Sequence, residues 1–306
     1  MGMNITITGA TGFVGMRLVH KLLQAGHAVH ALARARTAGL PPEVQFSEWH
    51  STQGEPPPES LAAADAVVHL AGEPVARRWT SEVKQRIRAS RVDGTRYLVN
   101  ALSTQPRRPQ VLVNASAIGF YGSRGDEILT EDSAPGDDFL AGVVRDWEKS
   151  AELAEALGIR VVRLRIGMVL GQGGALAQML PPFRMGLGGR LGGGKQWMSW
   201  IHIEDVTNLI LFAIQNNAVR GALNATSPNP VTNAEFTKEL AAALHRPAIL
   251  PIPALAVKLK FGEMANVVLA SQRVIPKAAQ AAGFQFEYPQ LKPALVRLLT
   301  GGSEAQ

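Results

Sequence analysis

The sequence has 306 residues, of which 46% are apolar and 18% charged, with 31 Lys and Arg against 25 Asp and Glu and no cysteine. This composition excludes a disordered or supercharged chain, and the lack of cysteine excludes thiolate catalysis, cysteine-based metal sites and disulfides. The sequence shows neither a signal peptide nor a run of about 20 apolar residues, so we expect a cytoplasmic protein without a membrane partner.

Short apolar strands alternate with helical patterns over the first 170 residues. Nearly continuous apolar strands separated by helices are typical of a parallel sheet that is covered on both faces. We therefore predict a doubly wound α/β (Rossmann) domain over residues 1–170. Its strands are expected at residues 4–8, 27–33, 44–46, 66–71, 110–115 and 160–166. Its helices are expected between the glycines at 9–15 and Gly26, and at 81–102 and 139–157.

The composition changes after residue 170. Residues 171–194 are rich in glycine and include Pro181 and Pro182. This composition favours a mobile loop, or a lid that covers a site, rather than a packed element. A smaller mixed C-terminal lobe is expected to follow, with a helix over 233–244. We assign 171–199 and 227–306 to this lobe, while 200–226, which includes a predicted helix at 205–215, is expected to return to the Rossmann domain.

The sharpest local motif is the segment Thr8–Gly15, which reads TGATGFVG between the first strand and the first helix. Glycines at this spacing permit a tight turn and a close approach to a pyrophosphate, and the N–H groups of the helix N-terminus receive its negative charge. The motif predicts a dinucleotide site. Its expected contacts are Gly9, Thr11, Gly12, Phe13, Val14 and Gly15.

The end of the second strand indicates which dinucleotide binds. An NAD site usually has an acidic residue there for the ribose 2′-hydroxyl, whereas this chain has Arg34 and Arg36 and no acid. The two arginines favour a 2′-phosphate and hence NADP(H). The alternative is that they are two solvated side chains in a loop.

The chain resembles the extended short-chain dehydrogenase/reductases, and more narrowly an epimerase-like branch with a short C-terminal domain of unknown function. The resemblance is carried by Thr8–Gly15, His69–Gly72, Ser116, Arg165–Gly171, Arg78-Trp79, Ser90-Arg91, Asp146–Glu148, Trp200–Asp205, Phe261–Met264, Ser271–Pro276 and Gly283-Phe284. It implies cofactor contacts at Leu70, Ala71 and Gly72 and through the backbone of Met168. Glu73 either bonds a cofactor ribose hydroxyl or is a plain loop acid.

The chain departs from this family at the catalytic pair. Active members use a Tyr, with a Lys four residues later, as the acid/base group; here Leu140 and Val144 stand at the aligned positions. Ser116 remains as a candidate donor to a substrate oxygen. Tyr121 is the nearest phenol, and it is either an acid/base group or, more in keeping with its family counterparts, a structural residue.

Other polar residues carry weaker signals. His69 lies in an apolar strand and is interpreted as a core residue. His202 and Asp205 are candidates for lining a substrate pocket, and Asp205 is alternatively a residue of a helix N-cap. Arg165 either reaches a substrate anion or pairs structurally. No His, Asp and Glu spacing suggests a metal site, and no G-x-S-x-G motif suggests a serine hydrolase.

Basic residues concentrate between residues 77 and 96, where seven Lys and Arg face only Glu82 and Asp93. This run is either a solvated helix face or a means of drawing an anionic ligand to the cofactor crevice. A nucleic-acid partner is not expected, because no binding motif is present and aromatic residues are sparse in the run.

These observations predict an NADP(H)-binding, epimerase-like or oxidoreductase protein that acts on a small, anionic substrate whose identity the sequence does not give. Ser116 would orient the reacting oxygen in such an enzyme. The alternative is a catalytically silent NADP(H) sensor or scaffold, in which the bound dinucleotide orders residues 171–194 for a partner protein.

Overall fold

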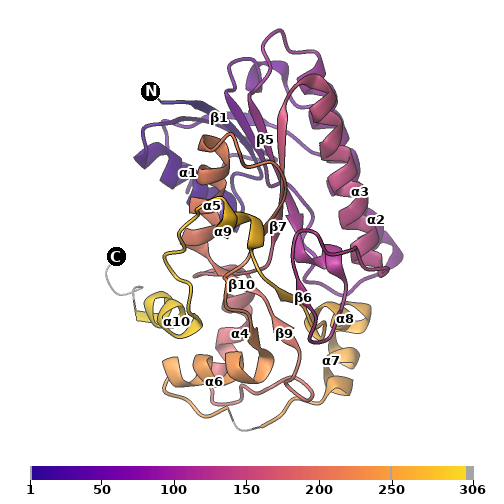
Figure 1. Cartoon of the computed structure of the whole chain (residues 1–306), viewed down its shortest axis with the longest axis vertical. Helices are drawn as coiled ribbons and strands as arrows, with labels where there is room; N and C mark the ends of the chain where they lie inside the picture. The colour runs from indigo at the N-terminus through magenta and orange to yellow at the C-terminus, as the bar shows by residue number, and fades with distance from the viewer. Residues whose placement is uncertain (1, 249, 301–306) are drawn as a thin grey trace.

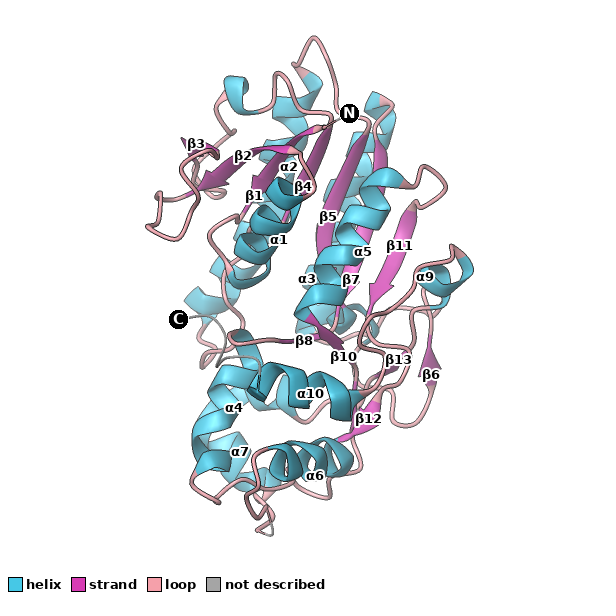
Figure 2. Cartoon of the chain, turned by 90° about the vertical axis from the view of Figure 1, so that its left-hand side faces the viewer, coloured by secondary structure: helices cyan, strands magenta, loops and turns pink. Residues whose placement is uncertain are grey.

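A computed structural model describes residues 2–248 and 250–300. Its centre is a seven-stranded sheet with the order β11-β7-β5-β4-β1-β2-β3, and every neighbouring pair is parallel (Figure 2). The strands are β1 (Asn4–Thr8), β2 (Ala28–Ala33), β3 (Gln45–Glu48), β4 (Ala66–His69), β5 (Val111–Ala117), β7 (Arg160–Ile166) and β11 (Gly221–Ala225). The doubly wound α/β fold is confirmed, and the strand order reverses direction between β1 and β4, where such sheets form their ligand crevice.

Helices cover both faces of the sheet (Figure 2). Side chains alternate along each strand, so that Val68 packs with α1 and α5 while its neighbour Val67 packs with α2 and α3. This two-sided burial explains why the strands are apolar almost throughout. The covering helices are α1 (Phe13–Gln24), α5 (Ile203–Gln215), α2 (Ser81–Ser103) and α3 (Phe139–Glu152), the last continued by a 3-10 turn at Leu153–Leu157.

The expected loop over residues 171–194 is in part a helix, so that prediction was wrong. α4 (Gly174–Arg184) buries Leu176 and Phe183 in a core with Trp200 and Phe236. Pro181 and Pro182 lie inside this helix, where their fixed φ is compatible with helical backbone. Packing of the apolar side chains therefore outweighs the turn signals from proline and glycine.

The C-terminal lobe lies below the sheet in Figure 1. Its core gathers apolar side chains of α4, α6 and α10 around Trp200. A short parallel pair, β6 with β13, joins the segment after β5 to the C-terminal part of the chain. The remaining elements are β6 (Ile128–Leu129), β8 (Met168–Leu170), β9 (Trp197–Met198), β10 (Trp200–His202), β12 (Val231–Thr232), α6 (Asn233–Ala243), α7 (Ala254–Phe261), α8 (Ala265–Val268), β13 (Arg273–Val274), α9 (Lys277–Ala281) and α10 (Leu291–Thr300), with short 3-10 turns at Pro58–Ser60, Ile118–Tyr121 and Gly262–Met264.

Across residues 2–248 and 250–300, none of the helices combines the length and the apolar character that crossing a membrane would require.

Candidate functional site

The turn between β1 and α1 is so tight that two of its positions require glycine and a third leaves little room for a side chain. Gly9 has a φ of +68°, and a Cβ there would lie 2.8 Å from the carbonyl carbon of Leu70. A Cβ on Gly15 would lie 2.2 Å from the carbonyl oxygen of Gly9, and one on Gly12 would lie 3.2 Å from it. These contacts hold the turn close to the end of β4, and of the three glycines Gly12 is the exposed one.

The N-terminus of α1 is prepared for an anion. Its N-cap is Gly12, which offers no side chain, and the first turn carries no acidic residue. The N–H groups of Phe13, Val14 and Gly15 therefore have no partner inside the helix and lie at the positive end of its dipole. Thr11, half-buried, precedes them in the same turn. Bare glycines beside uncapped N–H groups fit a pyrophosphate.

Two side chains of this segment are used in packing. The ring of Phe13 lies against Gly171, Gly173 and Gly174, where added Cβ atoms would come within 2.5, 2.8 and 3.2 Å of it. Val14 packs at the edge of the core formed with α5. Both residues are thus placed to offer backbone N–H groups to a ligand, while the Phe13 side chain ties the turn to the start of α4.

The end of β4 closes the other side of the turn. The N–H groups of Leu70 and Ala71 donate to the carbonyl oxygen and the hydroxyl of Thr8, at 3.1 and 3.2 Å. Gly72 is exposed. The carboxylate of Glu73 is paired with Arg77 at 2.8 Å, which gives it a structural partner within its own loop.

Arg91 contacts the loop that contains Gly72 and Glu73. Its side chain is half-buried, and its guanidinium donates to the carbonyl oxygens of Glu73 and Ile87 and lies 5.2 Å from the centre of the Trp147 ring. Burial lowers the pKa of Arg91 to about 10, with Glu73 opposing the shift. A side chain added at Gly72 would meet this guanidinium at 3.3 Å. The sequence motif Ser90-Arg91 marks this residue, but not its role.

The two arginines after β2 have different surroundings. Arg36 donates to the carbonyl oxygens of Val44 and Pro41, at 3.2 and 3.0 Å. Arg34 is exposed and, within the described part of the chain, makes no hydrogen bond or ion pair. A hollow of about 420 Å³ opens next to Arg36 and is lined by Arg36, Thr37, Ala38, Leu40 and Pro42. Arg34 is therefore the cation of the two that is free to meet a phosphate.

His69 is a core residue, as its apolar strand predicts. Its Nδ1 lies 2.6 Å from the hydroxyl of Thr8, and burial lowers its pKa to about 3. Because the Thr8 oxygen also accepts the N–H of Ala71, the histidine helps to fix the turn beside Gly9. Its role is to position the backbone rather than to transfer protons.

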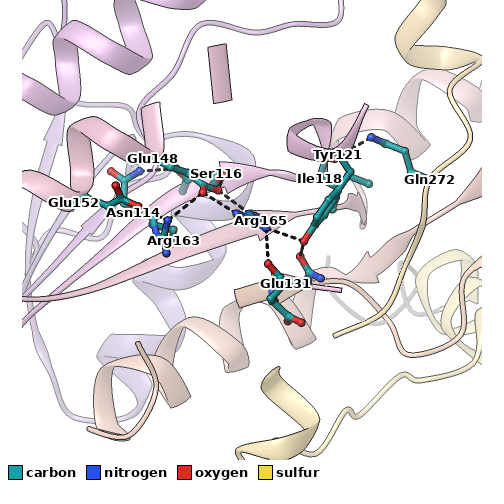
Figure 3. Close-up of polar contacts among 12 residues, drawn as sticks. Asn114, Ser116, Ile118, Tyr121, Glu131, Glu148, Glu152, Arg163, Arg165 and Gln272 are labelled. Atoms are coloured by element: carbon teal, nitrogen blue, oxygen red, sulfur yellow. Dashed lines mark hydrogen bonds and ion pairs between the residues drawn. The ribbon is translucent and has the colours of Figure 1, made fainter. Parts of the chain in front are cut away.

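Ser116 belongs to a buried polar network at the carboxyl ends of β5 and β7 (Figure 3). Its hydroxyl donates to Glu148 at 2.6 Å. Arg165 donates two hydrogen bonds to the same carboxylate, at 2.8 and 2.9 Å. Arg163 donates to the second oxygen at 3.4 Å. All of these side chains except Arg163 are nearly inaccessible to solvent. The hydroxyl hydrogen of Ser116 is therefore already used in a hydrogen bond within the protein.

Tyr121 lies in the same network (Figure 3). Its hydroxyl donates to Asn224 at 2.7 Å and accepts a hydrogen bond from Arg165 at 2.9 Å. Burial raises the pKa of Tyr121, although Arg165 and Asn224 oppose the shift. The ring of the adjacent Phe120 lies 3.5 Å from the Arg165 guanidinium. A fully buried phenol with both partners in place serves the fold, and in this arrangement it has no hydrogen left for a substrate.

The network also reaches the C-terminal part of the chain. Glu131 accepts the backbone N–H groups of Asn224 and Ala278 at one carboxylate oxygen, and Asn224 donates to the carbonyl oxygen of Ile275. Arg165 is thus a structural pair of Glu148, one of the two alternatives that the sequence leaves open. Burial alone would lower the pKa of Arg165, but its hydrogen bonds and charge interaction with Glu148 raise it.

The sequence analysis missed Glu148 and Asn224 as partners in this network. The register of the sheet places Ser116, Arg165 and Asn224 side by side on β5, β7 and β11. Polar residues at equal height in three apolar strands are a signal that such a network exists, but the strand order must be known before it can be used.

Leu140 and Val144 lie on the face of α3 that meets the segment after β5. Leu140 is half-buried against Gly119, and Val144 is buried with Phe120 and Tyr121. Neither position offers an ionisable group, so α3 presents an apolar surface there.

Met168, His202 and Asp205 all make contacts within the protein. The N–H of Met168 donates to Ser199 at 2.9 Å. His202 caps α5 and lies with its ring 3.9 Å from that of Tyr288, and burial lowers its pKa to about 4. Asp205 accepts the N–H groups of Glu287 and Tyr288. Both residues are buried in these contacts, which favours a structural role for them.

The basic run at 77–96 is largely paired. Its cations meet acids from other elements as well as their own helix, through the pairs Arg77–Glu73, Lys84–Glu263, Arg86–Glu82 and Arg88–Asp146. The structure therefore favours the alternative of a helix face stabilised by surface ion pairs.

Comparison with known proteins decides the family. Residues 5–225 match the model of the NAD dependent epimerase/dehydratase family, and residues 252–298 match a domain of unknown function, DUF1731. The chain belongs to the NAD dependent epimerase/dehydratase family. Curated relatives at 40–42% identity include an epimerase family protein of Bacillus subtilis, aligned over 97% of this chain and 98% of the relative, and a chloroplastic homologue of SDR39U1 from Arabidopsis thaliana, aligned over 96% and 86%.

Solved structures of epimerase-family proteins share the fold. Human epimerase family protein SDR39U1, crystallised with NADPH, is 35% identical, with a TM-score of 0.87 over 97% of this chain and 99% of that chain. A nucleoside-diphosphate sugar epimerase from Corynebacterium glutamicum is 37% identical with a TM-score of 0.79, over 98% of this chain and 58% of that chain. The expected resemblance to extended short-chain dehydrogenase/reductases with a C-terminal domain of unknown function is thus confirmed.

Proposed function

We propose that the chain binds NADP(H) in the crevice beside β1, as an epimerase-like oxidoreductase. The observation that carries the proposal is the bare, uncapped N-terminus of α1 next to Arg34, the free cation at the end of β2. The human relative that was crystallised with NADPH supports the same cofactor.

Each part of the site has a separate task in this proposal. Gly9, Gly12 and Gly15 let the pyrophosphate approach the backbone, and the first-turn N–H groups of α1 donate to it. Arg34 pairs with the 2′-phosphate. Bound NADPH supplies a hydride from C4 of its nicotinamide. The backbone of Ala71 and Gly72, which Arg91 and Thr8 hold in place, forms the wall of the crevice beside it.

The residues of this chain set limits on the proton-transfer chemistry. Ser116 and Tyr121 both donate their hydroxyl hydrogens inside the buried network. Leu140 and Val144 stand where the family's Tyr and Lys are expected. We infer that the substrate is a small carbonyl or carbinol compound and that its proton is exchanged with water or within the substrate itself.

A second candidate function is favoured by the same closed network. A protein that binds NADP(H) and lacks an accessible acid/base group is suited to report cofactor occupancy to a partner without turnover. Because α4 is already packed through Leu176 and Phe183, the ordering of residues 171–194 is not the signal in this version of the proposal.

The cofactor proposal is tested by titrating the purified protein with NADPH and NADH and following nicotinamide fluorescence. We expect a clear preference for NADPH, which Arg34→Ala abolishes because the 2′-phosphate loses its cation. Arg36→Ala is the matched control, since Arg36 is engaged with two carbonyl oxygens, and it should keep the preference. Equal affinity for the two cofactors in the unaltered protein would contradict the proposal.

Turnover separates the two candidate functions. NADPH oxidation with a panel of aldehydes, ketones and sugar nucleotides should identify a substrate class if the protein is an oxidoreductase. Activity that survives Ser116→Ala and Tyr121→Phe in folded protein would agree with their internal role, whereas a specific loss of the maximal rate would return them to the reaction.

A further inference from the structure

Large apolar side chains are exposed at the far end of the C-terminal lobe. Among the residues that the structure describes, nine large hydrophobic side chains are strongly exposed, and five of them come from two short segments, 184–195 and 250–260. They are Met185 (66% exposed), Leu187 (58%), Leu250 (63%), Leu255 (67%) and Leu259 (71%). Single exposed leucines are ordinary, but such a concentration marks an interaction surface.

The two segments lie side by side. The N–H of Ile252 donates to the carbonyl oxygen of Arg190, and the N–H of Gly192 donates to that of Ile252, both at 2.8 Å. A Cβ on Gly186 would lie 3.5 Å from the ring of Pro247. The exposed side chains of the 184–195 loop and of the 250–260 segment therefore belong to one part of the surface, at the lower end of the molecule in Figure 1.

α7 turns its leucines outward. Val257 is the buried residue of this helix, and Leu255 and Leu259 lie four positions apart on a different face. Lys258 and Lys260 flank these leucines and are exposed as well. The outer face of α7 thus combines aliphatic side chains with cations on long, flexible stems.

The charged residues of these two segments are all cations. The segments 184–195 and 245–260 contain no Asp or Glu, and in the described structure none of their cations takes part in an ion pair. All are exposed: Arg184, Arg190, Lys195, Arg246, Lys258 and Lys260. Their number equals the formal surplus of +6 of the whole chain. We call these cations and the five exposed apolar residues the basic apolar surface.

We propose that the basic apolar surface docks the protein onto an anionic lipid bilayer, with Leu255 and Leu259 entering the headgroup region and the cations meeting lipid phosphates. Exposed aliphatic side chains in the same segments as unpaired Lys and Arg are the chemistry that such an interface recognises. Docking of this kind needs no membrane-spanning helix. The expectation that the protein has no membrane partner was drawn from the lack of such a helix, so it does not bear on surface docking.

Other partners fit the surface less well. A second copy of the chain, related by a two-fold axis, would bring the same six cations against one another. Single-stranded nucleic acid is bound through aromatic stacking as well as charge, whereas the exposed apolar side chains here are aliphatic. An anionic bilayer satisfies both the charges and the leucines.

The proposal is tested by sedimenting the full chain with vesicles of phosphatidylcholine alone and of phosphatidylcholine mixed with phosphatidylglycerol. We expect at least about tenfold stronger binding to the mixed vesicles, weakened by added salt. The double variants Leu255→Ser/Leu259→Ser and Lys258→Glu/Lys260→Glu should each lose most of this binding. Their thermal unfolding midpoints should stay close to that of the unaltered protein, because all four side chains are exposed.

Matched controls come from the opposite end of the molecule. Arg145→Glu/Lys149→Glu reverses two exposed charges four positions apart on α3, and Leu153→Ser removes an exposed leucine; both should leave vesicle binding unchanged. Equal binding to neutral and anionic vesicles, or an equal loss in the α3 variant, would overturn the proposal. So would a dimer, seen without lipid, that Leu255→Ser/Leu259→Ser dissociates, because the surface would then be an interface between copies.

Discussion

The β1–α1 turn and the network around Glu148 lie at the same edge of the sheet, but they treat polar groups in opposite ways. In the turn, backbone N–H groups of α1 are left without a partner and no side chain covers them. In the network, the Ser116 and Tyr121 hydroxyls and both oxygens of Glu148 are already bonded. Buried atoms without a partner occur at the margin of the network, at Nε of Arg163 and Oε2 of Glu131. The N–H groups of the turn are available to a ligand, whereas the hydroxyls of Ser116 and Tyr121 are not.

Removing the carboxylate of the network should give the largest effect. Glu148→Ala leaves Arg165 buried without its counter-charge, and breaking a buried pair in this way costs about 3–5 kcal/mol of unfolding free energy. Urea denaturation followed by circular dichroism measures the loss. Glu152→Ala is the control, because this carboxylate is 40% exposed, and it should cost less than about 1 kcal/mol. A similar cost for both variants would show that the network is not the closed unit described above.

The second prediction concerns pH. The pKa of His202 is lowered to about 4 by burial, below the unfolded value near 6.5, so the unfolded chain takes up this proton first as the pH falls. The stabilisation is therefore complete above pH 6.5 and is lost on acidification towards pH 4. Between pH 7.5 and 5 this residue should account for a loss of about 2 kcal/mol.

The contribution of His202 is isolated with His202→Asn, since asparagine still caps a helix. The variant should lose about 2 kcal/mol less than the unaltered protein between the two pH values. If His202→Asn shows the full dependence, the acid sensitivity arises elsewhere.

The β1–α1 turn is disrupted most directly by a substitution at Gly15. A Cβ at Gly15 would overlap the carbonyl oxygen of Gly9, so Gly15→Ala must displace the turn and is expected to weaken NADPH binding at least about tenfold, or about 1.4 kcal/mol. Gly142→Ala is the control, because nothing lies within 4 Å of a Cβ there, and it should leave affinity unchanged. Unaltered affinity in folded Gly15→Ala would show that the dinucleotide binds elsewhere.

The sequence was sufficient to predict the β1–α1 turn but not the network around Glu148. Apolar runs mark the strands because both faces of the sheet are buried, and the glycine spacing marks the turn because only glycine fits against Leu70 and the Gly9 carbonyl. Both signals are local in the chain. Ser116, in contrast, meets a carboxylate 32 residues away, and Tyr121 meets an amide 103 residues away. No local pattern indicates such partners.

The lobe shows a second limit of prediction from sequence. Glycine and proline at 171–194 favour a loop, yet α4 forms because Leu176 and Phe183 complete a core with Phe236, which lies far along the chain. β11 was not predicted as a strand because Asn224 interrupts a short run that starts with glycine. In both cases the deciding interaction is tertiary, so local propensity gives the wrong answer or none.

The smallest effect on NADPH binding is expected at the phenol that the sequence offered as an acid/base group. Tyr121→Phe removes one hydroxyl that donates to Asn224 and accepts from Arg165, so both buried partners lose a hydrogen bond and the loss should be about 1–3 kcal/mol of unfolding free energy. NADPH affinity should not change, since the phenol is fully buried within the network. Tyr97→Phe is the matched control on α2, where the side chain is half-buried, and its cost should be near zero. A stable Tyr121→Phe protein with impaired NADPH binding or turnover would show that the closed network communicates with the open turn, and the two regions would then have to be treated as one site.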